Sequence, residues 1–179
     1  MSTSLKLRSA VTTLEREARR DLSLLWRRMD SAAMAGEALN DLLPAIVDTY
    51  GLAASAAAAQ YYDDARDRAG ARRRFTAEPV VIRETGSRAL VGYALNTART
   101  DAAFKVLIEG GLQRRIANFA RLTVTSSSIA DPGATGWVRV GVGECEWCQQ
   151  YLDGEVRTVE GYDFDAHDWC KCEAEPVFD

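Results

Sequence analysis

Apolar side chains recur every three or four residues over the first thirty positions of the chain. Arginine and glutamate fill most of the positions between them, and the apolar set is Leu7, Val11, Leu14, Ala18, Leu22, Leu25 and Met29. Because an α-helix has 3.6 residues per turn, this spacing gathers the apolar side chains on one face. The pattern predicts a long amphipathic helix.

The same helical periodicity resumes after a weak break near Gly36. Pro44 suits the first turn of a new helix, where its missing N–H costs nothing. Gly51 interrupts the pattern, and the alanine-rich stretch 53–59 then favours helix and close packing between helices. Gly70 closes this region and is followed by three consecutive arginines at 72–74.

Residues 75–86 are short of periodic apolar positions and contain a proline, which predicts an extended linker. A second helical section is expected over 87–130, with a break or kink at Gly110-Gly111. The polar run 123–128 and the segment 131–136 have the composition of turns and loops and predict a domain boundary. We therefore expect a helical body over 1–130, with long helices in 1–74.

The pattern changes after this boundary. Residues 137–142 alternate between apolar and polar positions and predict a strand. Asp153-Gly154 is typical of a turn, and 155–159 would form a second strand. The predicted fold is mainly α, with a multi-helix N-terminal body. Residues 131–179 are predicted to form a small α+β module, a β-hairpin held together by zinc.

All four cysteines and the only histidine lie near the C-terminus. Cys145 and Cys148 form a C-x2-C pair, and His167, Cys170 and Cys172 form an H-x2-C-x-C run. Tetrahedral zinc takes four sulfur or nitrogen donors at such spacings. Five candidates thus compete for four positions. Local spacing favours the first four, but Cys172 could replace a neighbour because residues two apart on a strand point the same way.

Disulfides and redox-active or inert thiols are the alternatives to zinc. The residues after Met1 lack the apolar run of a signal peptide, and thiols of cytosolic proteins stay reduced. A redox C-x2-C pair belongs in a βαβ context, which this helical chain does not suggest. We expect no stretch of transmembrane length, and hence a soluble protein that makes no membrane contact.

Charge is distributed unevenly along the chain. The net charge is −4, and residues 131–179 hold 3 Lys/Arg against 12 Asp/Glu. Modules that bind nucleic acid are usually basic, so the acidic C-terminal segment argues against that role for the zinc module. Its acidic surface is either simply solvated or meets a basic partner. Arg72, Arg73 and Arg74 remain candidates for contact with packaged DNA.

The C-terminal residues resemble the phage head morphogenesis family, the minor capsid proteins similar to the F protein of phage Mu, in versions from phages of actinobacteria. The likeness covers most of the chain and is most specific at Gly136-Trp137-Val138-Arg139, Cys145, Cys148, Leu152-Asp153-Gly154, His167, Cys170, Cys172 and the run Ala174–Phe178. Many relatives read H-P-N-C-R-C where this chain reads His-Asp-Trp-Cys-Lys-Cys from position 167.

The resemblance implies a minor head protein in the virion interior, made in the bacterial cytoplasm and present in several copies. Its expected partners are the portal or the major capsid protein, with a role in head assembly and in packaging or delivery of the genome. The family's cysteine and histidine positions correspond to Cys145, Cys148, His167, Cys170 and Cys172.

A capsid maturation protease is the enzyme alternative, because related phage genes often have that label. A serine hydrolase needs a histidine that is free to accept a proton from the serine hydroxyl. A histidine that binds zinc cannot do so, and Ser126, Ser127 and Ser128 have no partner in the sequence. Thiolate-rich ligation also favours a closed, structural metal site over a catalytic one. We therefore expect a protein that is not an enzyme.

Overall fold

Three long helices and a small two-stranded sheet form the fold in a computed structural model that describes residues 3–29, 31–83, 85–141, 146–158, 164 and 166–179. The elements follow one another along the chain as α1 (Thr3–Trp26), α2 (Ala32–Ala69), α3 (Ser87–Thr97), α4 (Asp101–Ala130), β1 (Ala134–Val140), α5 (Glu146–Gln149) and β2 (Glu173–Phe178). The mainly helical fold with a C-terminal antiparallel hairpin is confirmed.

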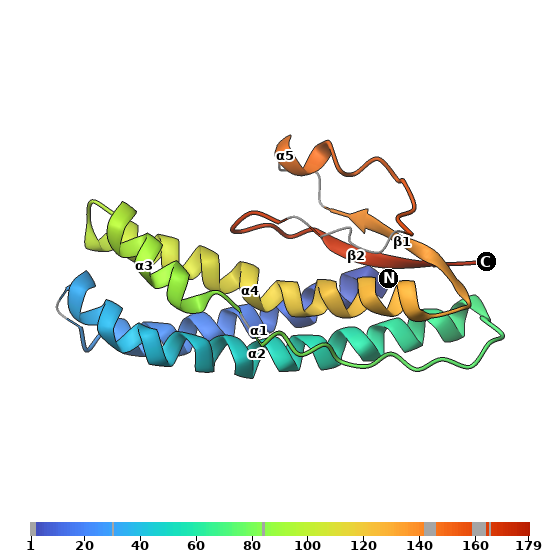
Figure 1. Cartoon of the computed structure of the whole chain (residues 1–179), viewed down its shortest axis with the longest axis horizontal. Coiled ribbons are helices and arrows are strands. Elements are labelled where there is room, and N and C mark those ends of the chain that lie inside the picture. Colours follow the sequence, from blue (N-terminus) through green and yellow to red (C-terminus); the bar gives the residue numbers. More distant parts are fainter. Residues whose placement is uncertain (1–2, 30, 84, 142–145, 159–163, 165) are drawn as a thin grey trace.

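Helices α1, α2 and α4 lie lengthwise beside one another, α3 covers one end, and the sheet lies on the α4 side (Figure 1). The most extensive contact in this bundle is between α2 and α4. The predicted face of α1 is confirmed, since Leu7, Val11, Ala18 and Leu22 are buried. Its burial against α2 and α4 stabilises a helix whose other face is charged.

Helix α2 is continuous through the positions where breaks were predicted, so the breaks at Gly36 and Gly51 and the helix start near Pro44 are wrong. Pro44 cannot donate to the carbonyl of Asn40, but the Arg88 Nε atom of α3 donates to that oxygen at 3.1 Å. Tertiary structure thus satisfies the group that proline leaves unpaired.

Glycines in the helices mark close approach instead of helix ends. A Cβ atom on Gly51 would lie 2.5 Å from the Phe119 ring of α4. Similarly, a Cβ on Gly110 would lie 2.7 Å from the Trp169 indole nitrogen. The predicted break at Gly110-Gly111 and the predicted loop over 123–128 are therefore wrong, since α4 runs unbroken to Ala130. The helix starts at Asp101, where the Thr100 hydroxyl accepts a hydrogen bond from the Ala103 N–H at 3.1 Å.

The length and composition of α2 would also allow it to cross a membrane, so the expectation that no stretch reaches that length is wrong. Core helices of soluble proteins pass the same test. Leu39, Leu43, Val47 and Ala54 of α2 are fully buried in this bundle. Packing against the neighbouring helices therefore accounts for part of the apolar composition of α2.

The hairpin differs from the predicted one in its second strand. β1 pairs antiparallel with β2, with Trp137 opposite Pro176, and residues 155–158 contribute only a bridge from Arg157 to Trp137. The Trp137 N–H donates to the Arg157 carbonyl at 3.1 Å, and the Arg157 N–H donates back at 2.8 Å. Trp137 therefore directs both its backbone N–H and its carbonyl toward Arg157 and has no backbone acceptor facing Pro176. The N–H that proline lacks would have no partner at this position.

Candidate metal centre

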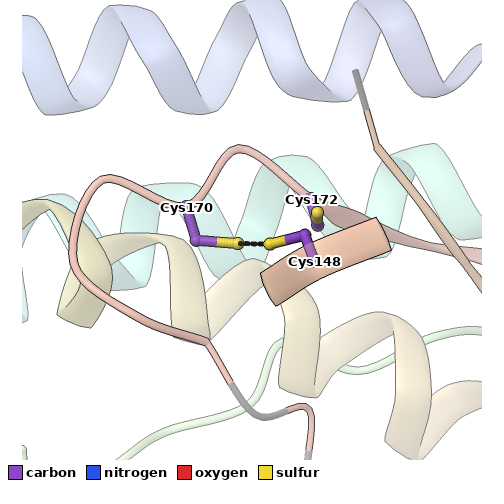
Figure 2. A group of neighbouring side chains, drawn as sticks. All are labelled: Cys148, Cys170 and Cys172. Carbon is purple, nitrogen blue, oxygen red and sulfur yellow. Dashed lines mark hydrogen bonds between the residues drawn. The ribbon is translucent and has the colours of Figure 1, made fainter. Parts of the chain in front are cut away.

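The candidate metal centre lies where the C-terminal loops meet α4. Cys148 is on the short helix α5, Cys170 is in the loop before β2, and Cys172 directly precedes that strand (Figure 2). All three side chains are buried. The sheet matters for this arrangement because β2 returns the chain to β1 and so places Cys172 near α5, which holds Cys148.

The three sulfur atoms lie within 4.8 Å of one another. The Cys148 and Cys170 sulfurs are 3.7 Å apart, as Figure 2 shows with a dashed line. Two thiolates on a tetrahedral zinc ion with bonds of about 2.3 Å are separated by about 3.8 Å. The observed separation therefore fits a shared tetrahedral ion, and the three buried cysteines could hold a metal.

His167 lies beside this cluster, with its Nε2 atom 3.3 Å from the Cys148 sulfur. Its Nδ1 atom lies 2.6 Å from the Asp168 carbonyl oxygen. A carbonyl oxygen only accepts hydrogen bonds, so in the neutral ring the proton belongs on Nδ1 and the lone pair on Nε2 faces the Cys148 sulfur. This is the arrangement in which a histidine can bind a metal ion.

Cys145, the fifth predicted donor, lies outside the described residues. The structure thus brings together Cys148, Cys170 and Cys172 and places His167 against the first of them. Besides the three sulfurs, a metal ion could take its fourth ligand from His167 or from Cys145. The predicted set of five remains open on this point.

Interactions between the thiols shift their pKa values in opposite directions. A hydrogen bond from Cys172 lowers the pKa of the Cys170 thiol, and the nearby positive charge of Arg121 lowers it further. The pKa of Cys172 is raised by its interaction with Cys170 and by burial. One sulfur of the pair therefore holds a negative charge easily, and a metal ion would replace the shared proton.

A tight turn presents His167 and Cys170 together. The Cys170 N–H donates to the His167 carbonyl at 3.2 Å. Trp169, the third residue of this turn, has φ +66°, which bulky side chains rarely adopt. Asparagine adopts this conformation more readily than tryptophan does.

Buried polar side chains of α4 attach the cysteine loop to the helical bundle. Arg121 donates from Nη2 to the Cys170 carbonyl at 2.8 Å and from Nε to the Cys172 carbonyl at 3.0 Å. Gln113 donates to the same Cys170 carbonyl at 3.1 Å and to Glu15 of α1 at 2.8 Å. These hydrogen bonds fix the backbone of the loop independently of any metal.

A second buried arginine lies among aromatic rings next to the sulfurs. The Arg139 guanidinium carbon is 4.3 Å from the centre of the Phe164 ring and 5.2 Å from that of Tyr151, and its Nη2 atom is 4.0 Å from the Cys170 sulfur. Sequence reasoning missed both arginines, because nothing in the local pattern distinguishes a buried arginine from a solvated one. For Arg139, the available signals were its place inside an alternating strand and its presence in the run Gly136-Trp137-Val138-Arg139 that carries the family resemblance.

The chain matches a known protein family along its whole length apart from Met1. The model of the VG15 protein family matches residues 2–179. The chain belongs to the VG15 protein family. This is a viral family, so the sequence-based assignment to a phage protein is confirmed at that level. No curated protein and no solved structure matches the chain.

Proposed function

We propose that this VG15 protein is a non-enzymatic minor head protein of a phage. It associates with the portal or the major capsid protein inside the head, in several copies, after synthesis in the bacterial cytoplasm. Membership of a phage family supports this role, together with the resemblance of the cysteine and histidine pattern to Mu F-like head proteins. The buried sulfur cluster attached to α4 is the observation on which the proposal rests.

The cluster favours a structural ion over a catalytic one. Catalytic zinc needs an open coordination position for water, whereas Cys148 and Cys170 are each only 2% exposed. His167 has both ring nitrogens engaged, one at a carbonyl and one at a sulfur. A histidine in that position is poorly suited to accept a proton from a nucleophile.

Zinc is the ion we propose, because three thiolates with one further sulfur or nitrogen donor form a typical structural zinc site. Its role is to join α5 to the loop before β2, because its cysteine ligands come from both. Structural zinc contributes roughly 10 to 16 kcal/mol of apparent binding free energy in small domains.

Metal analysis of the purified protein tests this part of the proposal. We expect about one zinc per chain in the wild type, a loss of zinc in Cys170→Ser, and no loss in the exposed control Glu155→Gln. Circular dichroism before and after chelation should show that most of the helix remains. We expect only residues from about 137 onward to depend on the metal, and a collapse of the helical signal would contradict this. Purified protein with its cysteines joined as disulfides would contradict the zinc proposal.

The fourth ligand can be identified with cobalt(II) in place of zinc. Charge-transfer absorption from sulfur to cobalt grows with the number of thiolate ligands. If His167 is the fourth ligand, His167→Ala should alter the ligand-field spectrum while Cys145→Ser leaves it unchanged. The reverse result would assign the position to Cys145.

An open apolar groove between α1 and α2 is the surface we propose for the head partner. Its cavity is about 610 Å³, and its lining includes Leu14, Ala53 and Ala57. Helix α2 has no charged residue between Asp48 and Asp63, although several side chains of that stretch face outward. Small uncharged side chains allow a partner helix to approach closely, which suits the largely helical proteins expected around a portal.

Co-expression with the portal and capsid proteins of the same phage tests this association. We expect the wild type to co-purify with one of them, Ala53→Glu to lose the association, and Ala102→Glu, which is exposed at the start of α4, to keep it. A chain that associates with neither protein at any salt concentration would contradict the proposal. Clean processing of capsid protein by the purified chain, abolished by His167→Ala with zinc retained, would instead establish the hydrolase alternative.

A further inference from the structure

A second cavity along α4 is lined by three arginines, of which Arg121 also holds the cysteine loop. It has a volume of about 300 Å³, and its lining contains Arg114, Arg115 and Arg121, with Thr85, Asn118 and Phe164. No carboxylate belongs to this lining among the described residues. Like charges crowded into one cavity are unfavourable unless an anion balances them.

Two of the three arginines have acidic neighbours. The Arg114 Nε atom lies 3.2 Å from a carboxylate oxygen of Asp168, and the Arg114 side chain is 37% exposed. Arg121 is buried and lowers the pKa of Glu15 and of Glu173 through its charge, although burial of these carboxyls raises their pKa overall. Both arginines are therefore at least partly compensated.

Arg115 differs, because all its hydrogen bonds go to neutral carbonyls. It donates from Nε to the Thr85 carbonyl at 2.8 Å, from Nη1 to Gly111 at 3.0 Å and from Nη2 to Gly86 at 2.9 Å. No carboxylate lies within ion-pair distance of it in the part of the chain that the structure describes. A guanidinium has five N–H donors, so two remain for a ligand while the other three fix its orientation.

The cationic surface extends past Thr85 into a neighbouring cavity of about 310 Å³. Arg83 and Arg88 line that cavity beside the first turn of α3, whose N-cap Gly86 provides no side-chain hydrogen bond to the helix. Free N–H groups at a helix start add to the attraction for anions. Asp48 is the acidic residue of that lining.

We propose that the cavity between α4 and residues 85–86 is a phosphate-binding site, with Arg114 and Arg115 as its ligands. Fixed guanidinium groups suit the several oxygen atoms of a phosphate, and the cavity is larger than a single carboxylate requires. A free phosphate group and the backbone of a nucleic acid share this chemistry. The site is separate from the groove between α1 and α2, so its failure would leave the proposed contact with head proteins untouched.

Titration calorimetry with inorganic phosphate at constant ionic strength tests the proposal. Relative to wild type, Arg114→Gln should weaken phosphate binding by about tenfold or more, as expected for the loss of one charge-assisted hydrogen bond. Arg16→Gln, at an exposed arginine of α1 that lines neither cavity, should leave binding unchanged. Asp168→Asn should strengthen it, because the carboxylate that competes for Arg114 is removed. A purely structural arginine cluster predicts no such gain.

Two further arms complete the experiment, with circular dichroism to show that every variant is folded. If a short DNA duplex binds with a salt dependence that Arg114→Gln reduces, the phosphates are those of a nucleic acid. Binding of inorganic phosphate without binding of the duplex would assign a free phosphate group instead. The proposal is overturned if wild type does not bind phosphate, if acetate binds equally well, or if Arg114→Gln binds phosphate as wild type does. Arg114→Lys, which keeps the charge, replaces Arg114→Gln if the latter is unfolded.

Discussion

Replacing Arg121 with methionine tests how the cysteine loop is attached to the helical bundle. The side chain is 1% exposed and donates three hydrogen bonds, to the carbonyls of Cys170 and Cys172 and to the Asn118 side chain at 3.0 Å. Methionine is unbranched and apolar, so it keeps the packing of the arginine stem but cannot make those bonds. The change therefore isolates the polar attachment from packing.

The expected loss of unfolding free energy follows from these contacts. A hydrogen bond from a charged donor contributes about 1.5 to 3 kcal/mol, and two of the three bonds join α4 to the loop. Gln113 still donates to the Cys170 carbonyl, so the penalty for that oxygen is reduced. We expect a loss of about 3 to 5 kcal/mol, the range found when one partner of a buried polar network is removed.

Urea unfolding of the zinc-loaded and the chelated protein provides the measurement. Arg121→Met should lower the midpoint in both states, and it should also weaken zinc binding because the unloaded loop is less ordered. Arg68→Met is the control, since its Nε atom bonds the Asp64 carbonyl on the exposed surface of α2. If both variants change stability equally, by less than about 0.5 kcal/mol, the attachment through Arg121 does not stabilise the fold.

Three further predictions concern the helical bundle. Gly51→Ala should destabilise the bundle by about 1 to 3 kcal/mol, because the new methyl group meets an aromatic ring of α4. In the same urea assay, Gly92→Ala should stabilise α3 by about 0.5 to 1 kcal/mol, because its methyl group meets nothing within 4 Å. Burial raises the pKa of Glu15, so unfolding free energy should fall as the pH rises above the usual range of a glutamate, and Glu15→Gln should flatten this decline in a series of unfolding curves. Asp131→Asn should lower the unfolding free energy by about 3 to 5 kcal/mol, because it leaves the buried guanidinium of Arg66, 2.8 Å from the carboxylate, without its counter-charge. Removing that guanidinium as well, in the double variant Arg66→Met/Asp131→Asn, should restore part of the loss, and a double variant only as stable as Asp131→Asn would contradict the reasoning.

The amphipathic pattern of α1 and the grouping of cysteines near the C-terminus were readable from the sequence because both depend on neighbours along the chain. Helical periodicity determines which face of α1 is apolar. The spacing of His167 and Cys170 closes a turn that presents both side chains together. Local geometry was enough for these conclusions, and the family match supports the class of protein they indicated.

Tertiary contacts decided the features that sequence reasoning misread. Gly51 looks like a helix break until the Phe119 ring is seen against it, and Pro44 looks like a helix start until Arg88 is found on the carbonyl it leaves free. The strand partner of β1 is more than thirty residues away and contains Pro176, which local rules count against a strand. Contacts between residues so distant in sequence leave no local periodic signal, because each partner lies on a different helix or strand.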